Sequence, residues 1–374
     1  MNKIYPPSPQ MLPSDGRFGA GPSRIRQEQV DALYAATELG TSHRKPAVKS
    51  RVHSIREGLS ELFTLPSGYE IAIGNGGATA FWSVAAASLV RERAKCAVFG
   101  EFGKKCASDW AAAPWLQVVV NEAPPGELSA VRDDIAQADV YAYPQNETST
   151  GVASGLYRGA PGDALTVVDA TSIAGASTVD WDLVDTYYFS PQKCLGSEGG
   201  LWLSILSPAA AQRAEELSAN KAGRFMPSFL NLASALKQSR LDQTLNTPAI
   251  ATLILLDEQI KWLLDQGGLA AAQDKAAAGA KLIADWAEKR PWAQMFVKDP
   301  EERSIVTSTV DLAPEVPAAE VASVLREVGI LDIEGYRGLG RNQLRIASFP
   351  SVETADIGAL LECIDWVAGQ MVGD

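Results

Sequence analysis

The chain has 374 residues, 46% of them hydrophobic and 21% charged, which is typical of a globular enzyme with one large and one small domain. Its formal net charge of −12 argues against a nucleic-acid partner, because no basic surface is available to neutralise phosphates. The charge does not exclude a small anionic substrate, since a site can be locally basic on an acidic protein.

Cysteine and histidine usage predicts a protein without a metal site, in a reducing compartment. The four cysteines, none in CxxC spacing, are Cys96, Cys106, Cys194 and Cys363. With only two histidines besides, a zinc site is not expected. Reduced thiols, a polar, proline-rich N-terminus and the lack of a long apolar run predict a cytoplasmic protein with no signal peptide and no membrane partner.

The first half of the chain alternates between predicted helices and strands. After an N-terminal arm (residues 1–16), helices are expected over 27–37 and from Ala47 to Leu62, where apolar residues recur with helical spacing. Strands are expected at 69–73, 96–99, 116–120 and 139–143, with helices at 78–91 and 104–112. This alternation favours a mostly parallel sheet covered by helices on both faces.

The second half continues this pattern and then changes. Short apolar runs at 165–168, 186–189 and 201–205 predict buried strands, and helices are expected at 208–219, 248–264 and 270–290. The tail combines strand-like segments at 304–312, 330–333 and 343–347 with helices at 318–328 and 354–370. We therefore expect a large domain over residues 17–265 and a small C-terminal α+β domain over residues 266–374.

Two of the predicted strands lead to an acid and a lysine. The first run ends at Asp169, and the second leads through Ser190-Pro191-Gln192 to Lys193. If both strands are parallel in an open α/β sheet, the two side chains emerge at the same edge. An acid that pairs with a pyridinium nitrogen and a lysine that forms a Schiff base are the two groups that pyridoxal phosphate needs. Taken alone, Asp169 could instead cap a turn, and Lys193 could be a solvated surface lysine.

Two polar segments lie at the same predicted edge. The glycine-rich turn Gly74–Thr79 precedes a predicted helix, whose free N–H groups and positive dipole end could bind a phosphate. The turn matches neither the dinucleotide fingerprint nor a Walker loop, and it could be only a tight connection. The segment Asn146–Thr150 is either a polar loop or a set of hydroxyl and amide donors at this edge.

Eight motifs in one order give the chain a wider resemblance. They are GPS at 21–23, SHR at 42–44, GNGGAT at 74–79, NETSTG at 146–151, VVDATS at 167–172, SPQK at 190–193, NTP at 246–248 and GYRGLGRNQLR at 335–345. In this order the motifs resemble the phosphoserine aminotransferases, a branch of the class V, fold-type I pyridoxal-phosphate enzymes. The resemblance implies an α/β fold, in which a mostly parallel seven-stranded sheet flanked by helices forms the large domain.

The resemblance implies roles for the residues around the cofactor. Lys193 would bind the cofactor covalently and later move the substrate proton, and Asp169 would pair with the pyridinium nitrogen. Three residues, Ala78, Thr79 and Gln192, would bind the cofactor phosphate. In addition, Thr148 would contact the hydroxyl side of the ring. The family stacks an aromatic ring, often tryptophan, on the cofactor face, and the matching residue here is Phe102.

The resemblance also implies how subunits and substrates are arranged. Asn246 and Thr247 would reach the phosphate of the neighbouring subunit's cofactor, so that a homodimer with shared active sites is needed for activity. Arg345 would bind the α-carboxylate of the substrate. The distal phosphate or γ-carboxylate would be read by His43, Arg44 and Arg337.

The segment before Arg345 departs from the family pattern. A histidine that is common in the family beside its last arginine is replaced by Tyr336, and the segment is longer than usual. Arg341 lies in this longer segment and is therefore a candidate for an additional phosphate contact.

The implied activity is a reversible transamination of 3-phosphohydroxypyruvate with L-glutamate to O-phospho-L-serine and 2-oxoglutarate, in serine biosynthesis. The related step of pyridoxine biosynthesis is left open. Another class V enzyme, such as a serine–glyoxylate aminotransferase, would share the cofactor residues but not the phosphate-reading arginines. A cysteine desulfurase would need a reactive thiol on a mobile loop, which neither Cys194 nor Cys363 supplies. A non-enzymatic glycine-loop binding module is the remaining alternative.

Overall fold

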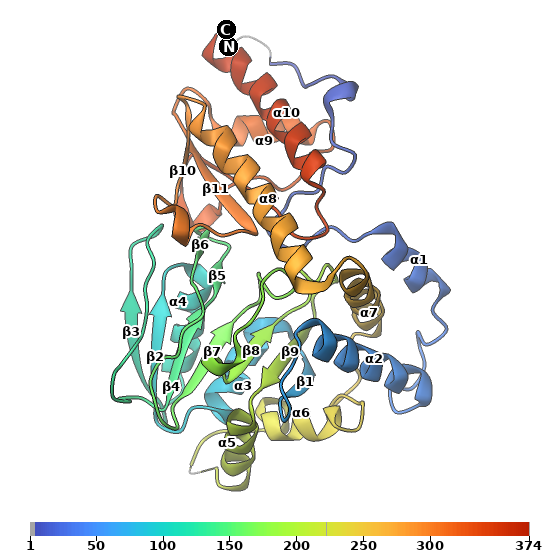
Figure 1. Ribbon diagram of the computed structural model, residues 1–374, viewed down its shortest axis with the longest axis vertical. Coiled ribbons are helices and arrows are strands. Elements are labelled where there is room, and N and C mark those ends of the chain that lie inside the picture. Colours follow the sequence, from blue (N-terminus) through green and yellow to red (C-terminus); the bar gives the residue numbers. More distant parts are fainter. Residues whose placement is uncertain (1–3, 222, 374) are drawn as a thin grey trace.

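A seven-stranded sheet forms the centre of the larger part of the molecule (Figure 1). The structure is a computed structural model that describes residues 4–221 and 223–373. In spatial order the strands are β1 (Glu70–Asn75), β9 (Leu201–Leu206), β8 (Thr186–Phe189), β7 (Leu165–Asp169), β4 (Val140–Pro144), β2 (Arg93–Val98) and β3 (Gln117–Glu122).

The sheet is parallel except for one strand. β9 runs antiparallel to both of its neighbours, β1 and β8. The pairs β8–β7, β7–β4, β4–β2 and β2–β3 are all parallel. The expected mostly parallel seven-stranded sheet is therefore confirmed, and with it the common direction of the two strands that lead to Asp169 and Lys193.

Helices cover both faces of this sheet, which explains why its central strands are continuous apolar runs. Along β9, Leu203 and Ile205 contribute to one apolar cluster, whereas Trp202 and Leu206 contribute to another on the opposite face. The first cluster contains the buried faces of α2 (Pro46–Leu62) and α7 (Ile250–Asp265). The second contains buried residues of α3 (Gly77–Ser88), α4 (Glu101–Ala111), α5 (Pro208–Ala219) and α6 (Leu232–Ser239).

A second, antiparallel sheet lies at the opposite end of the molecule, together with α10 (Figure 1). Its strands are β10 (Ala293–Met295), β11 (Thr307–Leu312) and β12 (Gln343–Ala347). Its helices are α8 (Gly268–Glu288), α9 (Ala318–Arg326) and α10 (Thr354–Val372). The boundary expected at residue 265 falls at the turn between α7 and α8; the division into domains stays a prediction.

One local expectation differs from the structure, and two short elements were not expected. The strand-like segment 330–333 does not join the second sheet as a strand; Leu331 instead forms a single bridge with Arg17 near the N-terminus. The short strand β10 and helix α6 were not predicted, because three residues and eight residues give too little periodicity to recognise. The remaining short elements are α1 (Gln27–Ala35), β5 (Asn146–Glu147), β6 (Val152–Ala153) and the 3₁₀ helices Pro9–Met11, Trp181–Leu183, Ser228–Leu230, Pro300–Glu302 and Arg337–Leu339.

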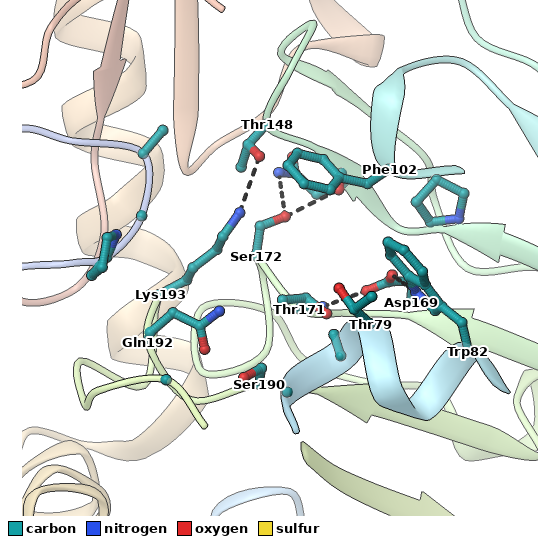
Figure 2. Close-up of a pocket in the computed structure, with 18 of the residues that line it drawn as sticks. Thr79, Trp82, Phe102, Thr148, Asp169, Thr171, Ser172, Ser190, Gln192 and Lys193 are labelled. Atoms are coloured by element: carbon teal, nitrogen blue, oxygen red, sulfur yellow. Dashed lines mark hydrogen bonds between the residues drawn. The ribbon is translucent and has the colours of Figure 1, made fainter. Parts of the chain in front are cut away.

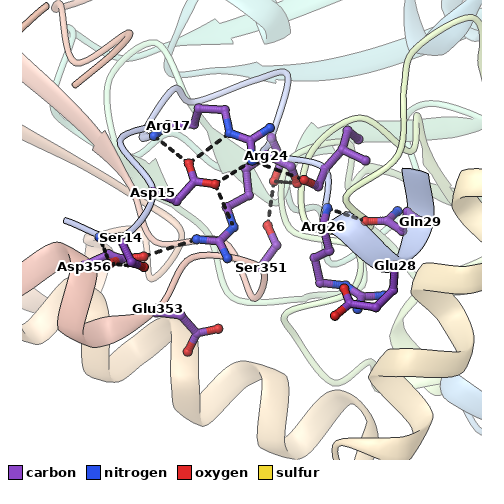
Figure 3. A network of polar contacts seen from close by, with 12 residues as sticks. Ser14, Asp15, Arg17, Arg24, Arg26, Glu28, Gln29, Ser351, Glu353 and Asp356 are labelled. Carbon is purple, nitrogen blue, oxygen red and sulfur yellow. Dashed lines mark hydrogen bonds and ion pairs between the residues drawn. The ribbon is translucent and has the colours of Figure 1, made fainter. Parts of the chain in front are cut away.

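The segment from Ser14 to Gln29 runs between the two sheets and is held by polar contacts at both ends (Figure 3). At one end the hydroxyl of Ser14 donates to Asp356 of α10 at 2.7 Å, and Arg24 pairs with the same carboxylate at 3.2 Å. At the other end Arg26 donates to Gln259 of α7 at 2.8 Å. Between these anchors the segment passes the carboxyl edge of the large sheet.

None of the helices in the described part of the chain is long and apolar enough to cross a membrane.

Candidate active site

A cavity of about 630 Å³ opens where β7 and β8 end, which is where open α/β sheets bind ligands. Its walls come from segments far apart in the sequence: the N-terminal segment, the glycine turn before α3, the first turn of α4, the ends of β4, β7 and β8, and the second sheet. The lining residues are Ala20–Pro22, Gly76–Thr79, Trp82, Phe102, Pro144, Asn146, Thr148, Asp169, Thr171, Ser172, Ser190, Gln192, Lys193, Glu198–Gly200, Tyr336 and Arg345.

Lys193 projects into this cavity and is almost completely buried, with 9% of its surface exposed (Figure 2). Its Nζ donates a hydrogen bond to Thr148 Oγ1 at 3.0 Å. Burial lowers the pKa of Lys193 to about 8; the nearby Asp169 opposes this shift, and Arg345 adds to it. The lowered pKa makes the neutral, nucleophilic amine available close to neutral pH.

Asp169 is held at the opposite side of the cavity by three donors (Figure 2). Its carboxylate accepts the backbone N–H of Thr171 at 2.9 Å, the hydroxyl of Tyr188 at 3.0 Å and the indole N–H of Trp82 at 3.4 Å. Tyr188 is the residue of β8 that pairs with Asp169 across the sheet. These three donors fix the orientation of the carboxylate, as an acid facing a pyridinium nitrogen requires.

The start of α3 forms an anion site beside Lys193. Gly76 and Gly77 have φ values of +110° and +69°, a left-handed conformation that brings the turn under the cavity. Gly76 is the N-cap and supplies no side chain, so the first N–H groups of the helix have no capping partner. Ala78 and Thr79 lie in this first turn and line the cavity. A phosphate placed here would meet free N–H donors and the positive end of the helix dipole.

Several buried polar atoms of the cavity walls lack a partner within the described chain. They are Asn146 Oδ1, Thr171 Oγ1, Gln192 Oε1 and Arg345 Nε. Buried polar groups without hydrogen bonds are costly, so their presence around one cavity indicates a polar ligand. Together with a nucleophilic amine, a carboxylate and an anion site, these groups fit the aldehyde, the pyridinium nitrogen and the phosphate of pyridoxal phosphate.

An aromatic ring and an arginine complete the cavity. The ring of Phe102 lies with its centroid 5.1 Å from Lys193 Nζ, where a residue that stacks on the cofactor is expected. Arg345 reaches the cavity from β12 in the second sheet and donates to the carbonyl of Thr148 at 3.2 Å. Its guanidinium lies 5.5 Å from the ring centroid of Tyr336, which also lines the cavity.

Four of the expected site residues lie together, but outside this cavity. His43 Nδ1 is 3.1 Å from Thr247 Oγ1, and Arg44 donates to the carbonyl of Leu245 at 3.0 Å, so His43, Arg44, Asn246 and Thr247 form one group, the 43–247 patch. The patch borders the glycine turn, because Asn75 donates to the carbonyl of Thr247 at 2.8 Å. Arg337 is exposed and does not line the cavity, although its neighbour Tyr336 does.

Arg341, the candidate for an additional phosphate contact, does not line the cavity. Its guanidinium donates to both carboxylate oxygens of Asp311, at 3.0 and 2.6 Å, and lies 4.6 Å from the ring centroid of Phe296. The ion pair engages Nε and Nη2 of the guanidinium, and a phosphate contact by Arg341 stays a prediction.

Two site residues were missed from the sequence. Trp82 lies four positions after Ala78, one helical turn along α3, so helical spacing could have placed it on the same face. Tyr188 acquires its role only through pairing of β7 with β8, which no local pattern reveals. In residues 4–221 and 223–373, no cluster of three or more histidine, cysteine or acidic side chains is arranged to hold a metal ion.

Comparisons with known proteins agree with this geometry. The family model of the class-V aminotransferases matches residues 23–338 of the chain. The chain belongs to the class-V aminotransferase family. A phosphoserine aminotransferase from Nocardioides sp. is 48% identical over 96% of this chain and 97% of its own length. A relative from Mycolicibacterium vanbaalenii, provisionally given the same name, is 50% identical over 96% of this chain and 97% of its own length.

Solved structures share the fold. A phosphoserine aminotransferase from Cytophaga hutchinsonii superposes with a TM-score of 0.86 at 24% identity and covers 93% of this chain and 97% of that one. The enzyme from Bacillus circulans subsp. alkalophilus gives a TM-score of 0.79 at 21% identity, over 94% of this chain and 98% of that one. The expected family and the fold-type I architecture are confirmed. This class-V aminotransferase is an enzyme, and its cofactor is pyridoxal phosphate.

The close approach of Gly21 to Lys193 gives a first prediction. Gly21 has a φ of +126°, and a Cβ added there would lie 2.8 Å from Lys193 Cε. We expect Gly21→Ala to displace the lysine and to weaken cofactor binding about 10-fold or more, because small misplacements of reacting groups are costly. Titration of the cofactor-free protein with pyridoxal phosphate measures this. The matched control is Gly162→Ala, which has a φ of +81° and open space around the added Cβ. Equal affinities of the two variants would contradict the prediction.

The lowered pKa of Lys193 gives a second prediction. Below pH 8 the amine is mostly protonated, so the rate at which cofactor-free protein develops its visible absorption band should rise roughly 10-fold per pH unit and level off above pH about 8. Stopped-flow absorbance between pH 6 and 10 measures the profile, and Lys193→Ala should develop no band. A rate that keeps rising to the ordinary lysine pKa of 10.5 would show that the amine is not desolvated as described.

Proposed function

We propose that this enzyme transfers the amino group of L-glutamate to 3-phosphohydroxypyruvate, reversibly, and releases O-phospho-L-serine and 2-oxoglutarate. The main support is that Lys193 and Asp169 face one cavity together with Arg345. Two relatives that are 50% and 48% identical to this chain are named as phosphoserine aminotransferases, the first provisionally. Their names support the choice of substrate. We place the reaction in serine biosynthesis and in the cytoplasm, where four free, buried cysteines stay reduced.

The cavity assigns a task to each group. The bound cofactor supplies an electron-withdrawing ring that stabilises negative charge at the substrate α-carbon. Asp169 keeps the ring nitrogen protonated through its negative charge. Lys193 Nζ, whose pKa of about 8 is close to the working pH, removes the proton from the α-carbon and delivers a proton in the reverse direction. Phe102, which lines the cavity, would cover one face of the ring and exclude water from it.

Arg345 is the group that we assign to the α-carboxylate of both substrates. It lies at the cavity wall, it is largely buried, and its Nε has no partner within the described chain. A guanidinium binds a carboxylate with two parallel hydrogen bonds, which orients the α-carbon toward Lys193. The second anionic group of phosphoserine or glutamate then needs another cation, and no further arginine lines the cavity in the described part of this chain.

We propose that a second copy of the chain supplies this cation, through the 43–247 patch. The patch combines His43 and Arg44 with Asn246 and Thr247 on the outside of the chain, next to the glycine turn. Large apolar side chains are also exposed on this chain, which is typical of a surface that pairs with another subunit. Examples are Tyr34 (94% exposed), Phe225 (67%), Leu241 (52%) and Phe229 (46%).

Donor specificity tests the proposed reaction. With 2-oxoglutarate as acceptor, O-phospho-L-serine should be converted with a kcat/KM about 100-fold or more above that of L-serine, because a buried cation left without its anion is penalised. Arg345→Gln should raise KM for every donor, and Lys193→Ala should abolish turnover and the visible band. A preference for serine with glyoxylate as acceptor would favour a serine–glyoxylate aminotransferase. A colourless protein that never binds the cofactor would refute both activities.

Mixed dimers test the shared active site. Asn246 is exposed, and Asn246→Asp places a negative charge where we expect the partner's cofactor phosphate. Each site of a hybrid between Lys193→Ala and Asn246→Asp chains depends on both chains, so one of its two sites is intact. Mixing two nearly inactive variants after reversible dissociation should therefore recover about one quarter of wild-type activity. If mixing recovers nothing, or if the protein sediments as a monomer at full activity, the proposal fails.

A further inference from the structure

Glu147 is a carboxylate that the reaction as described does not use. It is completely buried, lies next to the cavity, and is not one of the residues that line it. Within residues 4–221 and 223–373, no lysine, arginine or histidine forms an ion pair with it. A charge buried without an ionic partner is expensive, so it is retained only where its hydrogen bonds serve a purpose.

The hydrogen bonds of Glu147 converge on the first turn of α4. Oε1 accepts the backbone N–H of Gly103 at 2.6 Å, and Oε2 accepts the N–H of Phe102 at 3.4 Å and the hydroxyl of Ser149 at 2.9 Å. The Ser149 oxygen in turn accepts the N–H of Glu101 at 3.0 Å. The N-cap of α4 is Gly100, which has no side chain to satisfy these groups. Glu147 therefore caps α4 from a different segment of the chain, with a negative charge at the positive end of the helix dipole.

The hydrogen bonds of Glu147 connect the first turn of α4 to the segment that contains Thr148, and both contribute residues to the site. The first turn of α4 contains Phe102, whose ring centroid lies 5.1 Å from Lys193 Nζ. The residue after Glu147 is Thr148, whose hydroxyl accepts from Lys193 at 3.0 Å and whose carbonyl accepts from Arg345 at 3.2 Å. The carboxylate of Glu147 thus links the backbone of Phe102 to Thr148. Thr148 in turn contacts both Lys193 and Arg345.

Two further observations support a role in positioning. A Cβ on Gly100 would lie 2.6 Å from the carboxyl group of Glu147, so this residue must be small for the carboxylate to reach the helix. Burial raises the pKa of Glu147 to about 7, whereas the hydrogen bonds from Gly103, Ser149 and Phe102 lower it. The donors therefore stabilise the charged form that caps the helix.

We infer that Glu147 is a positioning residue, which fixes Phe102 against the cofactor ring by capping α4 from the 146–149 segment. The inference rests on the cofactor site of the proposed function and not on its substrate. Glu147 does not touch the reacting atoms; it acts through the place and orientation of Phe102.

The test compares Glu147→Ala and Glu147→Gln in the full-length holoenzyme. Glu147→Ala should weaken cofactor affinity about 10-fold and reduce the visible circular dichroism of the bound cofactor, because the ring loses its fixed neighbour. Glu147→Gln keeps an oxygen for Gly103 but turns an NH₂ group toward Phe102, so its effect should be smaller and in the same direction. In a Phe102→Leu background, Glu147→Ala should have little further effect on either measurement.

A matched control separates positioning from general stability. Asp185 is also a buried carboxylate that accepts a backbone N–H, that of Thr166 at 2.8 Å, but it lies away from the cavity. Asp185→Asn should lower thermal stability and leave cofactor affinity and visible dichroism unchanged. The inference is overturned if the Glu147 variants behave like this control, or if their loss of affinity persists undiminished with Phe102→Leu. If Glu147→Ala does not fold, Glu147→Gln decides by the same two readouts. Wild-type protein that bound no cofactor would refute the proposed function itself, before any variant is compared.

Discussion

The parallel pairing of β7 with β8 is the constraint on which the site depends. It brings Asp169 and Lys193 to one edge of the sheet from strands that end side by side. It also sets Tyr188 opposite Asp169, where its hydroxyl donates to the carboxylate at 3.0 Å. A cofactor ring bound at this edge would lie close to both groups, since Asp169 ends β7 and Lys193 lies in the turn that follows β8.

Burial and oriented polar neighbours together set the chemistry of Lys193, Asp169 and Glu147. Lys193 loses hydration and becomes a weaker base, which frees its amine near neutral pH. The two carboxylates, unlike the lysine, accept several hydrogen bonds. Asp169 accepts three, and Glu147 accepts the N–H groups at the start of α4. Each buried charge is thus balanced by oriented dipoles as well as by distant charges, which keeps the groups rigid before a ligand arrives.

A single chain leaves the recognition of the second anionic group incomplete. Arg345 reaches the cavity from β12, whereas His43, Arg44, Asn246 and Thr247 gather in the 43–247 patch outside it. Under the proposed arrangement, a partner subunit would bring its own copy of the patch to the cavity.

The sequence by itself determined the features that depend on local pattern. Apolar runs and helical spacing predicted the strands and most helices, and two of those strands predicted that Asp169 and Lys193 lie at one sheet edge. Local pattern failed where an element depends on distant contacts. Residues 330–333 resemble a strand in composition, yet Leu331 pairs only with Arg17, and the partner of Arg341 is Asp311.

Only the tertiary structure decided how buried polar groups are satisfied. Nothing near Glu147 in sequence indicates that its carboxylate caps a helix beginning at Glu101, because hydrogen bonds across the core leave no periodic signal. The same holds for the donors around Asp169 and for the distance between Phe102 and Lys193. Composition and spacing specify which surfaces are buried, whereas the pairing of individual donors and acceptors is fixed only when the packed elements bring them into contact.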